Sequence, residues 1–324
     1  MKPKILVTRR IPNEGIKLLE EKFELDINEE DRVLTKEEII ERLKDKDAML
    51  CLLTDTIDKE IIQAYPKLKV ISNYAVGFNN IDVEAATEKG IPVTNTPGVL
   101  TETTADLAFT LLTAIARRIV ESDKYARQGK FKGWAPMMLL GQDIYKKKLG
   151  IIGLGRIGHA IAKRAHKGFD MKILYTDLQK DEEFEKEYDA SFLTKEELLK
   201  QADFVSLHVP LTEETKHLIA EKELEMMKET AYLINTSRGL IIKEEALVNA
   251  LKEKKIAGAA LDVFEEEPKI HQGLKELDNA IIVPHIGSAS KETRGKMAEM
   301  AAKNLINIFE GKKPLSIVNE EVLK

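Results

Sequence analysis

A glycine-rich segment at residues 153–158 has the spacing of a phosphate-binding turn. It reads GLGRIG, and it lies between a strand-like apolar run and a helical pattern over Ile157–Lys167. Gly153 suits a tight bend, Gly155 lets a pyrophosphate approach the backbone, and Gly158 lets the helix pack closely on the sheet. The spacing therefore indicates a dinucleotide-binding turn, with the pyrophosphate at the positive end of the helix.

The start of that helix and an acidic residue further along support this prediction. Arg156 and Ile157 open the helix, where backbone N–H groups have no partner within the helix and can bind phosphate oxygens. Asp177 ends the next predicted strand, 19 residues after Gly158, where a carboxylate accepts hydrogen bonds from the adenosine ribose. Because a carboxylate there repels a 2′-phosphate, NAD(H) is favoured over NADP(H), although Lys180 could partly offset the charge. A flavin dinucleotide and a purely structural turn are the alternatives.

Three polar stretches follow predicted strands in the second half of the chain. They are 235–239 (NTSRG), 262–268 (DVFEEEP) and 284–288 (PHIGS). Open α/β sheets bind ligands at the carboxyl ends of their strands, so an arginine, a carboxylate and a histidine are expected to meet in one crevice. An arginine binds an anion through a fork of N–H groups, and a histidine oriented by a carboxylate exchanges protons near neutral pH. This set suits a reaction on an anionic carbonyl compound, although each residue alone also fits a surface or structural role.

Strand-like runs alternate with helical patterns along the whole chain, which is typical of parallel sheets covered by helices. The first series extends from Lys4–Thr8 to Pro92–Asn95, and a long helical pattern over Thr103–Arg127 follows it. A second series of six strands starts at Leu149 and matches the strand count of a dinucleotide-binding fold. A last helix is expected over Lys291–Phe309.

Composition limits the classes of partner. The length of 324 residues suggests two domains, and 50 basic against 55 acidic residues give a net charge of −5, so no nucleic-acid partner is expected. The single cysteine, Cys51, excludes a disulfide within the chain and a cysteine-based zinc cluster, and no metal site is expected. With neither a signal-peptide pattern nor an apolar run long enough to span a membrane, the sequence predicts a cytoplasmic protein without a membrane partner.

Seven motifs in this order resemble the D-isomer-specific 2-hydroxyacid dehydrogenase family over essentially the whole chain, with glyoxylate and hydroxypyruvate reductases as the nearest subgroup. The motifs are NYAVGFNNID from Asn73, TETTAD from Thr101, GLGRIG from Gly153, HVPLT from His208, INTSRG from Ile234, ALDVFEEEP from Ala260 and PHIGSA from Pro284. The resemblance implies an α/β fold of two Rossmann-like or flavodoxin-like domains with parallel sheets. It implies a substrate-binding domain at 1–98 plus 288–324, with an NAD-binding Rossmann domain at 99–287 inserted into it.

The resemblance also implies NAD(P)H-dependent reduction of small 2-keto acids such as glyoxylate and hydroxypyruvate. Arg238 would bind the substrate carboxylate and keto oxygen, His285 would donate the proton, and Glu267 would keep His285 protonated. The other implied substrate-binding residues are Leu53, Val76 and Gly77. Besides the glycine-rich turn and Asp177, the implied cofactor-binding residues are Thr104, His208, Val209, Pro210, Thr215, Thr236, Ser237, Arg238, Asp262, His285 and Gly287.

The same resemblance leaves two other functions open, a D-3-phosphoglycerate dehydrogenase and, more remotely, an NAD-sensing corepressor-like binding protein. Family members usually form dimers through the nucleotide domain, so a homodimer is expected. Trp134 resembles a tryptophan that reaches the site of a neighbouring subunit, although ordinary interface packing explains it equally well. At two turns where the family often has glycine, this chain has Lys146 and Asp170.

Overall fold

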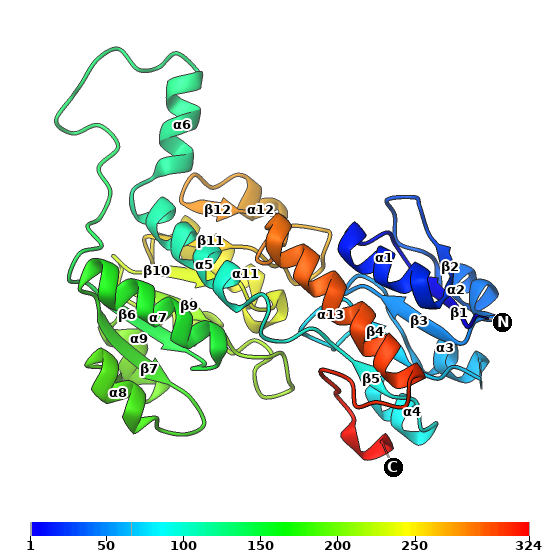
Figure 1. The fold of residues 1–324 in the computed structure, drawn as a ribbon. Coiled ribbons are helices and arrows are strands. Elements are labelled where there is room, and N and C mark those ends of the chain that lie inside the picture. Colours follow the sequence, from blue (N-terminus) through cyan, green and yellow to red (C-terminus); the bar gives the residue numbers. More distant parts are fainter. Residues whose placement is uncertain (1, 66, 324) are drawn as a thin grey trace. The chain divides into compact units, whose positions relative to one another are not determined.

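The structure, a computed structural model, describes residues 2–65 and 67–323. The chain forms two units: Met1–Leu100 with Ser288–Lys324, and Thr101–Gly287, which is inserted into the first unit in sequence (Figure 1). Each unit contains one sheet whose paired strands run parallel, with helices packed on it. The predicted α/β fold class with two parallel sheets is confirmed.

The sheet of the first unit has the strand order β2-β1-β3-β4-β5, which is the order of flavodoxin-like folds. Its strands are β1 (Lys4–Val7), β2 (Glu24–Ile27), β3 (Ala48–Cys51), β4 (Ile71–Asn73) and β5 (Val93–Thr94). Its helices are α1 (Asn13–Lys22), α2 (Lys36–Leu43), α3 (Lys59–Ala64), α4 (Val83–Glu88) and α13 (Lys291–Phe309), with a 3₁₀ turn, η2, at Glu320–Val322.

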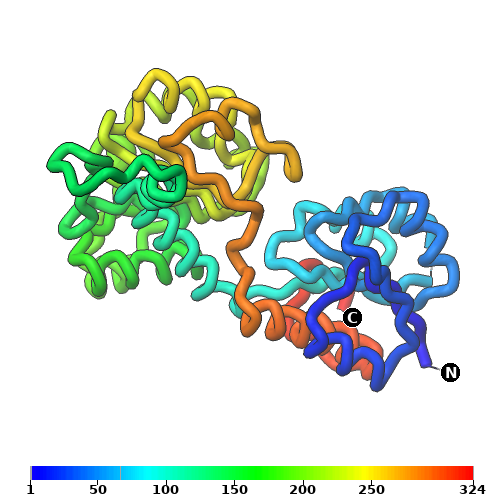
Figure 2. Tube along the Cα trace, turned by 90° about the horizontal axis from the view of Figure 1, so that it is seen from above, coloured from blue at the N-terminus to red at the C-terminus, as the bar shows by residue number. Residues whose placement is uncertain are grey.

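Local sequence determines where several of these helices begin. Thr35 and Glu38 form a reciprocal capping box at the start of α2, and the Ser290 hydroxyl caps α13. Helices α1 and α13, from opposite ends of the chain, pack side by side (Figures 1 and 2). Gly15 permits this approach, because a Cβ at that position would lie 2.6 Å from the carbonyl oxygen of Ala298.

The sheet of the second unit has the order β12-β11-β10-β9-β6-β7-β8, which contains the dinucleotide-binding order with one additional strand. Its strands are β6 (Lys148–Ile152), β7 (Lys172–Thr176), β8 (Ser191–Phe192), β9 (Phe204–Leu207), β10 (Tyr232–Asn235), β11 (Gly258–Leu261) and β12 (Ala280–Ile282). Its helices are α5 (Thr101–Ala116), α6 (Ile119–Arg127), α7 (Arg156–Phe169), α8 (Glu182–Tyr188), α9 (Lys195–Gln201), α10 (Glu221–Met226), α11 (Glu244–Lys252) and α12 (Gln272–Lys275), with a 3₁₀ turn, η1, at Gly239–Ile241. The prediction of six strands missed β8, a two-residue exposed edge strand.

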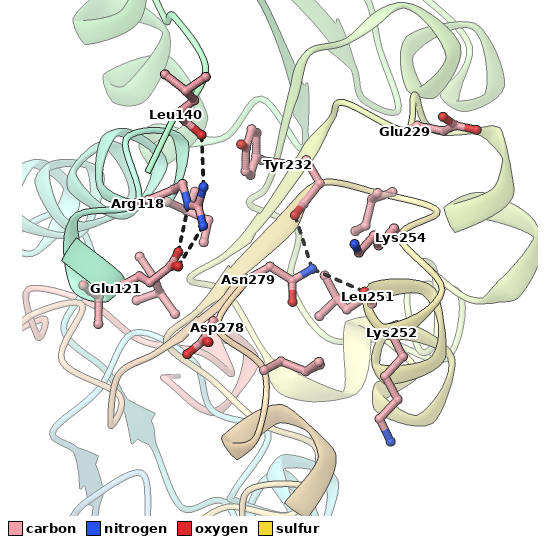
Figure 3. A pocket seen from close by; sticks show the side chains of 16 residues that line it. Arg118, Glu121, Leu140, Glu229, Tyr232, Leu251, Lys252, Lys254, Asp278 and Asn279 are labelled. Atoms are coloured by element: carbon pink, nitrogen blue, oxygen red, sulfur yellow. Dashed lines mark hydrogen bonds and ion pairs between the residues drawn. The ribbon is translucent and has the colours of Figure 1, made fainter. Parts of the chain in front are cut away.

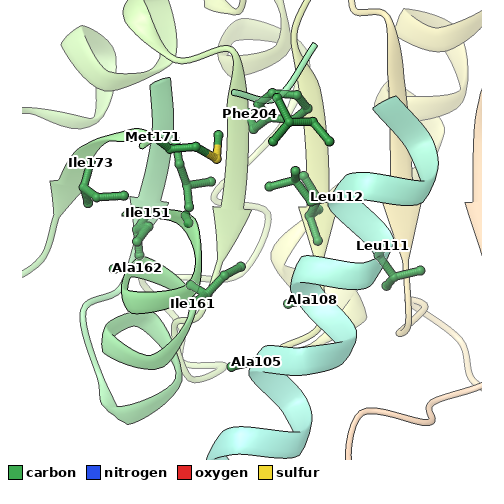
Figure 4. Packing of buried hydrophobic residues seen from close by; sticks show 14 of the residues in the cluster. Ala105, Ala108, Leu111, Leu112, Ile151, Ile161, Ala162, Met171, Ile173 and Phe204 are labelled. Carbon is green, nitrogen blue, oxygen red and sulfur yellow. The ribbon is translucent and has the colours of Figure 1, made fainter. Parts of the chain in front are cut away.

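Helix α5 supplies one wall of the main core of the second unit (Figure 4). Its apolar positions, including Ala108 and Leu112, face Ile161 of α7 and Phe204 of β9. Leu112, Ile161 and Phe204 are fully buried, and burial of each such side chain contributes roughly 1.5–3 kcal/mol. Among the helices of the described chain, none is long and apolar enough to span a bilayer.

The prediction of one continuous helix over Thr103–Arg127 is wrong, because the chain turns between α5 and α6. Arg118 adopts a left-handed conformation with φ of 52°. Its guanidinium binds both carboxylate oxygens of Glu121, at 2.7 and 2.8 Å, and donates to the carbonyl of Leu140 at 3.2 Å. These contacts stabilise the break between α5 and α6, which the spacing of apolar residues does not indicate. Beyond it, α6 has no buried residue, and with the segment that follows it extends from the body of the unit as an arm, residues 119–140 (Figure 1).

Candidate active site

The glycine-rich turn connects β6 to α7 and forms an open cradle. Gly153 has φ of +95°, and a Cβ there would lie 2.8 Å from the backbone carbonyl of His208. A Cβ on Gly158 would lie 2.3 Å from the carbonyl oxygen of Gly153, so glycine is required for α7 to start this close to β6. By contrast, among the described residues no atom beyond Gly155 and its chain neighbours lies within 4 Å of a Cβ placed on Gly155, the residue before α7. The open space at Gly155 lies at a helix N-terminus, which suits a pyrophosphate.

Asp177 follows β7 and is bonded back to this turn. Its Oδ2 accepts the N–H of Leu154 at 2.5 Å, and its Oδ1 accepts the N–H of Leu178 at 2.6 Å. These bonds fix the carboxylate beside the turn that leads into Arg156 and Ile157, the first two residues of α7. Each carboxylate oxygen keeps a further lone pair, so the group can also accept a ribose hydroxyl.

The segment after β9 forms the neighbouring wall of the cradle. Burial lowers the pKa of His208 to about 3, so its ring is neutral, and Ser206 Oγ lies 2.8 Å from Nε2. Val209 and the backbone of His208 are the groups that a side chain on the first glycine would strike. Further along, the hydroxyl of Thr215 donates to the carbonyl of Pro210 at 2.6 Å. Thr215 therefore holds its own loop in shape.

The turn after β10 is organised by Asn235, a residue that the sequence analysis did not single out. Asn235 Oδ1 accepts both the N–H and the hydroxyl of Ser237, at 3.0 and 2.7 Å, and its Nδ2 donates to the carbonyl of Arg238 at 2.9 Å. Thr236 Oγ1 is buried, and within the described residues it has no hydrogen-bond partner. A buried hydroxyl without a partner is costly, so this atom fits a polar group of a bound cofactor.

Glu267 and His285 form a hydrogen-bonded pair. Nδ1 of His285 lies 2.8 Å from Oε2 of Glu267, and the other carboxylate oxygen accepts the N–H of Phe264 at 3.0 Å. Burial raises the pKa of Glu267, but the hydrogen bond and charge of His285, the N–H of Phe264 and the charge of Arg238 together outweigh burial, and the pKa is lowered. The carboxylate is thus ionised near neutral pH.

Arg238 is brought to this pair by the packing of two loops. A Cβ on Gly239 would lie 1.9 Å from the backbone carbonyl of Phe264, so the turn that carries Arg238 rests directly on the loop that carries Glu267. Burial lowers the pKa of Arg238 and the charge of Glu267 opposes that shift, but an arginine keeps its proton in proteins. One cation, one anion and one imidazole therefore lie at the carboxyl ends of neighbouring strands.

Asp262 fixes the backbone that follows His285. Its two oxygens accept the N–H groups of Ile286 and Gly287 at 2.6 and 2.8 Å, and its carbonyl accepts the N–H of His285 at 2.9 Å. Burial raises the pKa of Asp262 to about 6. A Cβ on Gly287 would lie 3.1 Å from the Asp262 carboxylate and 3.5 Å from the methyl carbon of Thr104, so these predicted cofactor residues are neighbours.

A second histidine–glutamate pair supports the loop of Glu267, and the sequence analysis missed it. His217 Nε2 lies 2.5 Å from Glu265 Oε1, and the N–H of Glu265 donates to Glu244 Oε1 at 2.7 Å. Glu244 is buried at the start of α11, and burial raises its pKa. These contacts anchor the loop two residues before Glu267.

Three predicted substrate residues, Leu53, Val76 and Gly77, lie in the first unit, after β3 and β4. Asn73 Nδ2 donates to the carbonyl of Gly77 at 2.9 Å, and Asn95 Nδ2 donates to the carbonyl of Val76 at 2.8 Å. The two peptide groups are thus held by their carbonyls, and within the described chain their N–H groups have no acceptor. The two asparagines were not singled out from the sequence.

A separate hollow of about 510 Å³ lies at the base of α6 (Figure 3). Arg118, Glu121 and Leu140 line one side, and Tyr232 and Asn279 lie across from them. None of the predicted catalytic or binding residues lines this hollow. Within the described residues, no group of three or more His, Cys, Asp or Glu side chains could hold a metal ion.

Comparison with known proteins gives consistent matches. Residues 109–287 match a family described as "D-isomer specific 2-hydroxyacid dehydrogenase, NAD binding domain". A protein of Korarchaeum cryptofilum named glyoxylate reductase is 56% identical over an alignment of 326 positions, which covers 100% of this chain and 98% of that protein.

Two solved structures are similar over nearly the full length. A Thermus thermophilus protein is 44% identical with a TM-score of 0.91, and the match covers 97% of this chain and 99% of that one. A Sinorhizobium meliloti NADPH-dependent glyoxylate/hydroxypyruvate reductase, in complex with NADP and malonate, is 32% identical with a TM-score of 0.87 and coverages of 99% and 98%.

Proposed function

The chain belongs to the D-isomer specific 2-hydroxyacid dehydrogenase family, and on this premise we propose that it reduces small 2-keto acids, glyoxylate and hydroxypyruvate, to 2-hydroxy acids with NADH. The name glyoxylate reductase of the relative from Korarchaeum cryptofilum supports the substrate class. The observation that carries the proposal is the 2.8 Å contact between Glu267 and His285, on a loop packed against the turn of Arg238.

In this proposal His285 is the general acid. Its Nδ1 is bonded to Glu267, so Nε2 is the atom that would give a proton to the keto oxygen. The carboxylate of Glu267, with its lowered pKa, remains charged and orients the imidazole ring through Nδ1. In the direction of oxidation, the same nitrogen would accept the proton of the hydroxyl group.

Arg238 is the proposed anchor of the substrate, because its fork of N–H groups can bind the carboxylate and the keto oxygen together. We assign a substrate-binding domain to residues 1–98 plus 288–324 and an NAD-binding domain to 99–287. In the first of these, the N–H groups of Val76 and Gly77 would bind the substrate carboxylate, and Leu53 would line the pocket.

The dinucleotide is assigned to the cradle of the second unit. When bound, NADH supplies the hydride. Asp177 would accept the ribose hydroxyls and disfavour a 2′-phosphate. The buried hydroxyl of Thr236 and the open space at Gly155 support this fit. The other residues proposed to hold the cofactor are Thr104, Gly153, Arg156, Ile157, Gly158, His208, Val209, Pro210, Thr215, Ser237, Arg238, Asp262, His285 and Gly287.

We further propose that the enzyme is a cytoplasmic homodimer. Large apolar side chains are exposed on the arm, including Ile119, Phe131, Trp134 and Met137. Trp134 is 83% exposed, and a concentration of exposed large apolar side chains on one segment is typical of an interface. A second copy of the chain is the proposed partner, because family members usually dimerise through the NAD-binding domain, to which the arm belongs.

The test is the variant His285→Ala, assayed for loss of NADH absorbance with glyoxylate and with hydroxypyruvate. Loss of a general acid is expected to lower kcat by about 10²- to 10⁴-fold. Binding of NADH, measured by fluorescence titration, should persist, and His166→Ala on α7 serves as the matched control. Normal turnover by His285→Ala would contradict the assigned acid. Absence of turnover by the wild-type protein with any 2-keto acid would favour a binding protein instead.

A further inference from the structure

The loop between β7 and α8 encloses a shallow hollow of about 370 Å³ beside the glycine-rich turn. It lies where the proposed function places the adenosine ribose. One ammonium group, that of Lys180, and four carboxylates line it. The lining carboxylates are those of Asp177, Asp181, Glu182 and Glu183. A 2′-phosphate in this hollow would therefore meet a strongly negative surface, and Lys180 is its one basic lining residue.

The ammonium group of Lys180, however, is paired with a carboxylate that does not line the hollow. Its Nζ lies 3.0 Å from Oε2 of Glu185, which is on α8 and does not line the hollow. This hydrogen bond and the charge of Glu185 raise the pKa of Lys180. The ammonium is thus paired with a carboxylate before any ligand arrives.

Glu185 is itself held firmly. Its Oε1 accepts the N–H of Phe192 on β8 at 2.9 Å, and its side chain is only 19% exposed. Burial raises the pKa of Glu185, but the hydrogen bond of Lys180, the N–H of Phe192 and the charge of Lys180 outweigh burial, and the pKa is lowered. Glu185 therefore has a fixed position and a permanent charge, whereas Lys180 is half exposed and can move.

We propose that Glu185 is a positioning residue for cofactor choice: it holds the ammonium of Lys180 in an ion pair, so that this cation is not free to bind a 2′-phosphate in the ribose hollow. The proposal rests on the proposed function, which places the adenosine ribose in this hollow. Asp177 then repels the 2′-phosphate, and Glu185 keeps Lys180 from offsetting that repulsion.

The test is the variant Glu185→Gln, with dissociation constants of NADH and NADPH measured by fluorescence titration. Glutamine keeps the acceptor for the Phe192 N–H but releases the ammonium of Lys180. The ratio of the NADPH to the NADH dissociation constant is expected to fall by roughly three- to tenfold, and less at high salt. Adding Lys180→Ala to the variant should remove this gain.

Glu187→Gln is the matched control, because it removes the same charge from the same helix but releases Lys167 instead, which Glu187 contacts at 3.2 Å. An unchanged ratio in Glu185→Gln, or an equal fall in Glu187→Gln, overturns the inference while NADH binding by the wild type still supports the proposed function. A wild-type protein that binds neither dinucleotide overturns both.

Discussion

A single buried carboxylate gives the active-site backbone a pH-dependent stability. Burial raises the pKa of Asp262 from an ordinary 3.8 to about 6, so the folded protein keeps a proton there that the unfolded chain releases. The contribution of this group to the free energy of unfolding must therefore fall as the pH rises through that window, by up to about 3 kcal/mol. Below the window, both states are protonated and the contribution is constant.

Comparison of the wild type with Asp262→Asn isolates this effect. Unfolding by urea, measured at several pH values between about 4 and 7, should give a stability difference, wild type minus variant, that declines with increasing pH. Asp278→Asn, at a carboxylate that is 71% exposed, is the control and should give a flat difference. A difference for Asp262→Asn that stays flat or grows with pH would refute the assignment.

At the residue scale, the sequence predicts site residues where the chemistry of the side chain is rare. Arg238, Glu267 and His285 were predicted from residue type, their place after strands and the family resemblance. Asn235 and Asn95 were missed, because their roles lie in bonds to carbonyl and hydroxyl groups that only the fold brings near. An asparagine in a turn has many local explanations, so its type alone does not indicate such a role.

At the element scale, eight non-glycine residues of the described chain have a left-handed backbone, and two of them lie in turns beside β6 and α7. Lys146 has φ of 61° in the turn before β6, and Asp170 has φ of 51° at the end of α7. These are the two positions where the sequence departs from the glycine common in the family. A residue with a Cβ, such as lysine, is destabilised by about 1 kcal/mol in the left-handed region, whereas glycine adopts it without this cost.

The variant Lys146→Gly should therefore raise the free energy of unfolding, by about 0.5–1 kcal/mol. The side chain it removes is exposed and lies over the ring of Tyr145, a contact of small value at the surface. Lys147→Gly is the matched control, since Lys147 is not among the residues with positive φ and glycine there should destabilise. Thermal unfolding of both variants tests this prediction. Equal changes in the unfolding temperature would mean that glycine at position 146 relieves no backbone strain.

The spacing of apolar residues predicted most helices and strands. It failed at a helix break held by an ion pair and at a very short exposed strand. The predicted helix over Lys291–Phe309 is confirmed with its ends, since Ser290 caps it and its apolar positions face the first sheet. The break at Arg118 was missed, because neither glycine nor proline marks it and its cause is an ion pair with Glu121. Strand β8 was missed, because two exposed residues show no alternation.

At the scale of the whole molecule, the apolar surface is unevenly distributed. Of the thirteen large apolar side chains exposed in the described chain, six lie between residues 119 and 140. They belong to the arm, where a left-handed Arg118 directs the chain away from α5. A monomer rarely keeps such a surface in water, so a second copy of the chain is expected to cover it.

The double variant Trp134→Ser with Met137→Ser should separate the subunits. Both side chains are more than three-quarters exposed. Interface anchors contribute about 2 kcal/mol or more each, so the dimer dissociation constant should rise by roughly 10³-fold. Sedimentation velocity over a concentration series measures the change, with Val33→Ser in the first unit as the control for loss of exposed apolar surface. Because the arm belongs to the NAD-binding unit, NADH affinity reports whether that unit remains folded. A double variant that stays dimeric, or a wild type that is monomeric at every concentration, would show that the arm does not join two copies.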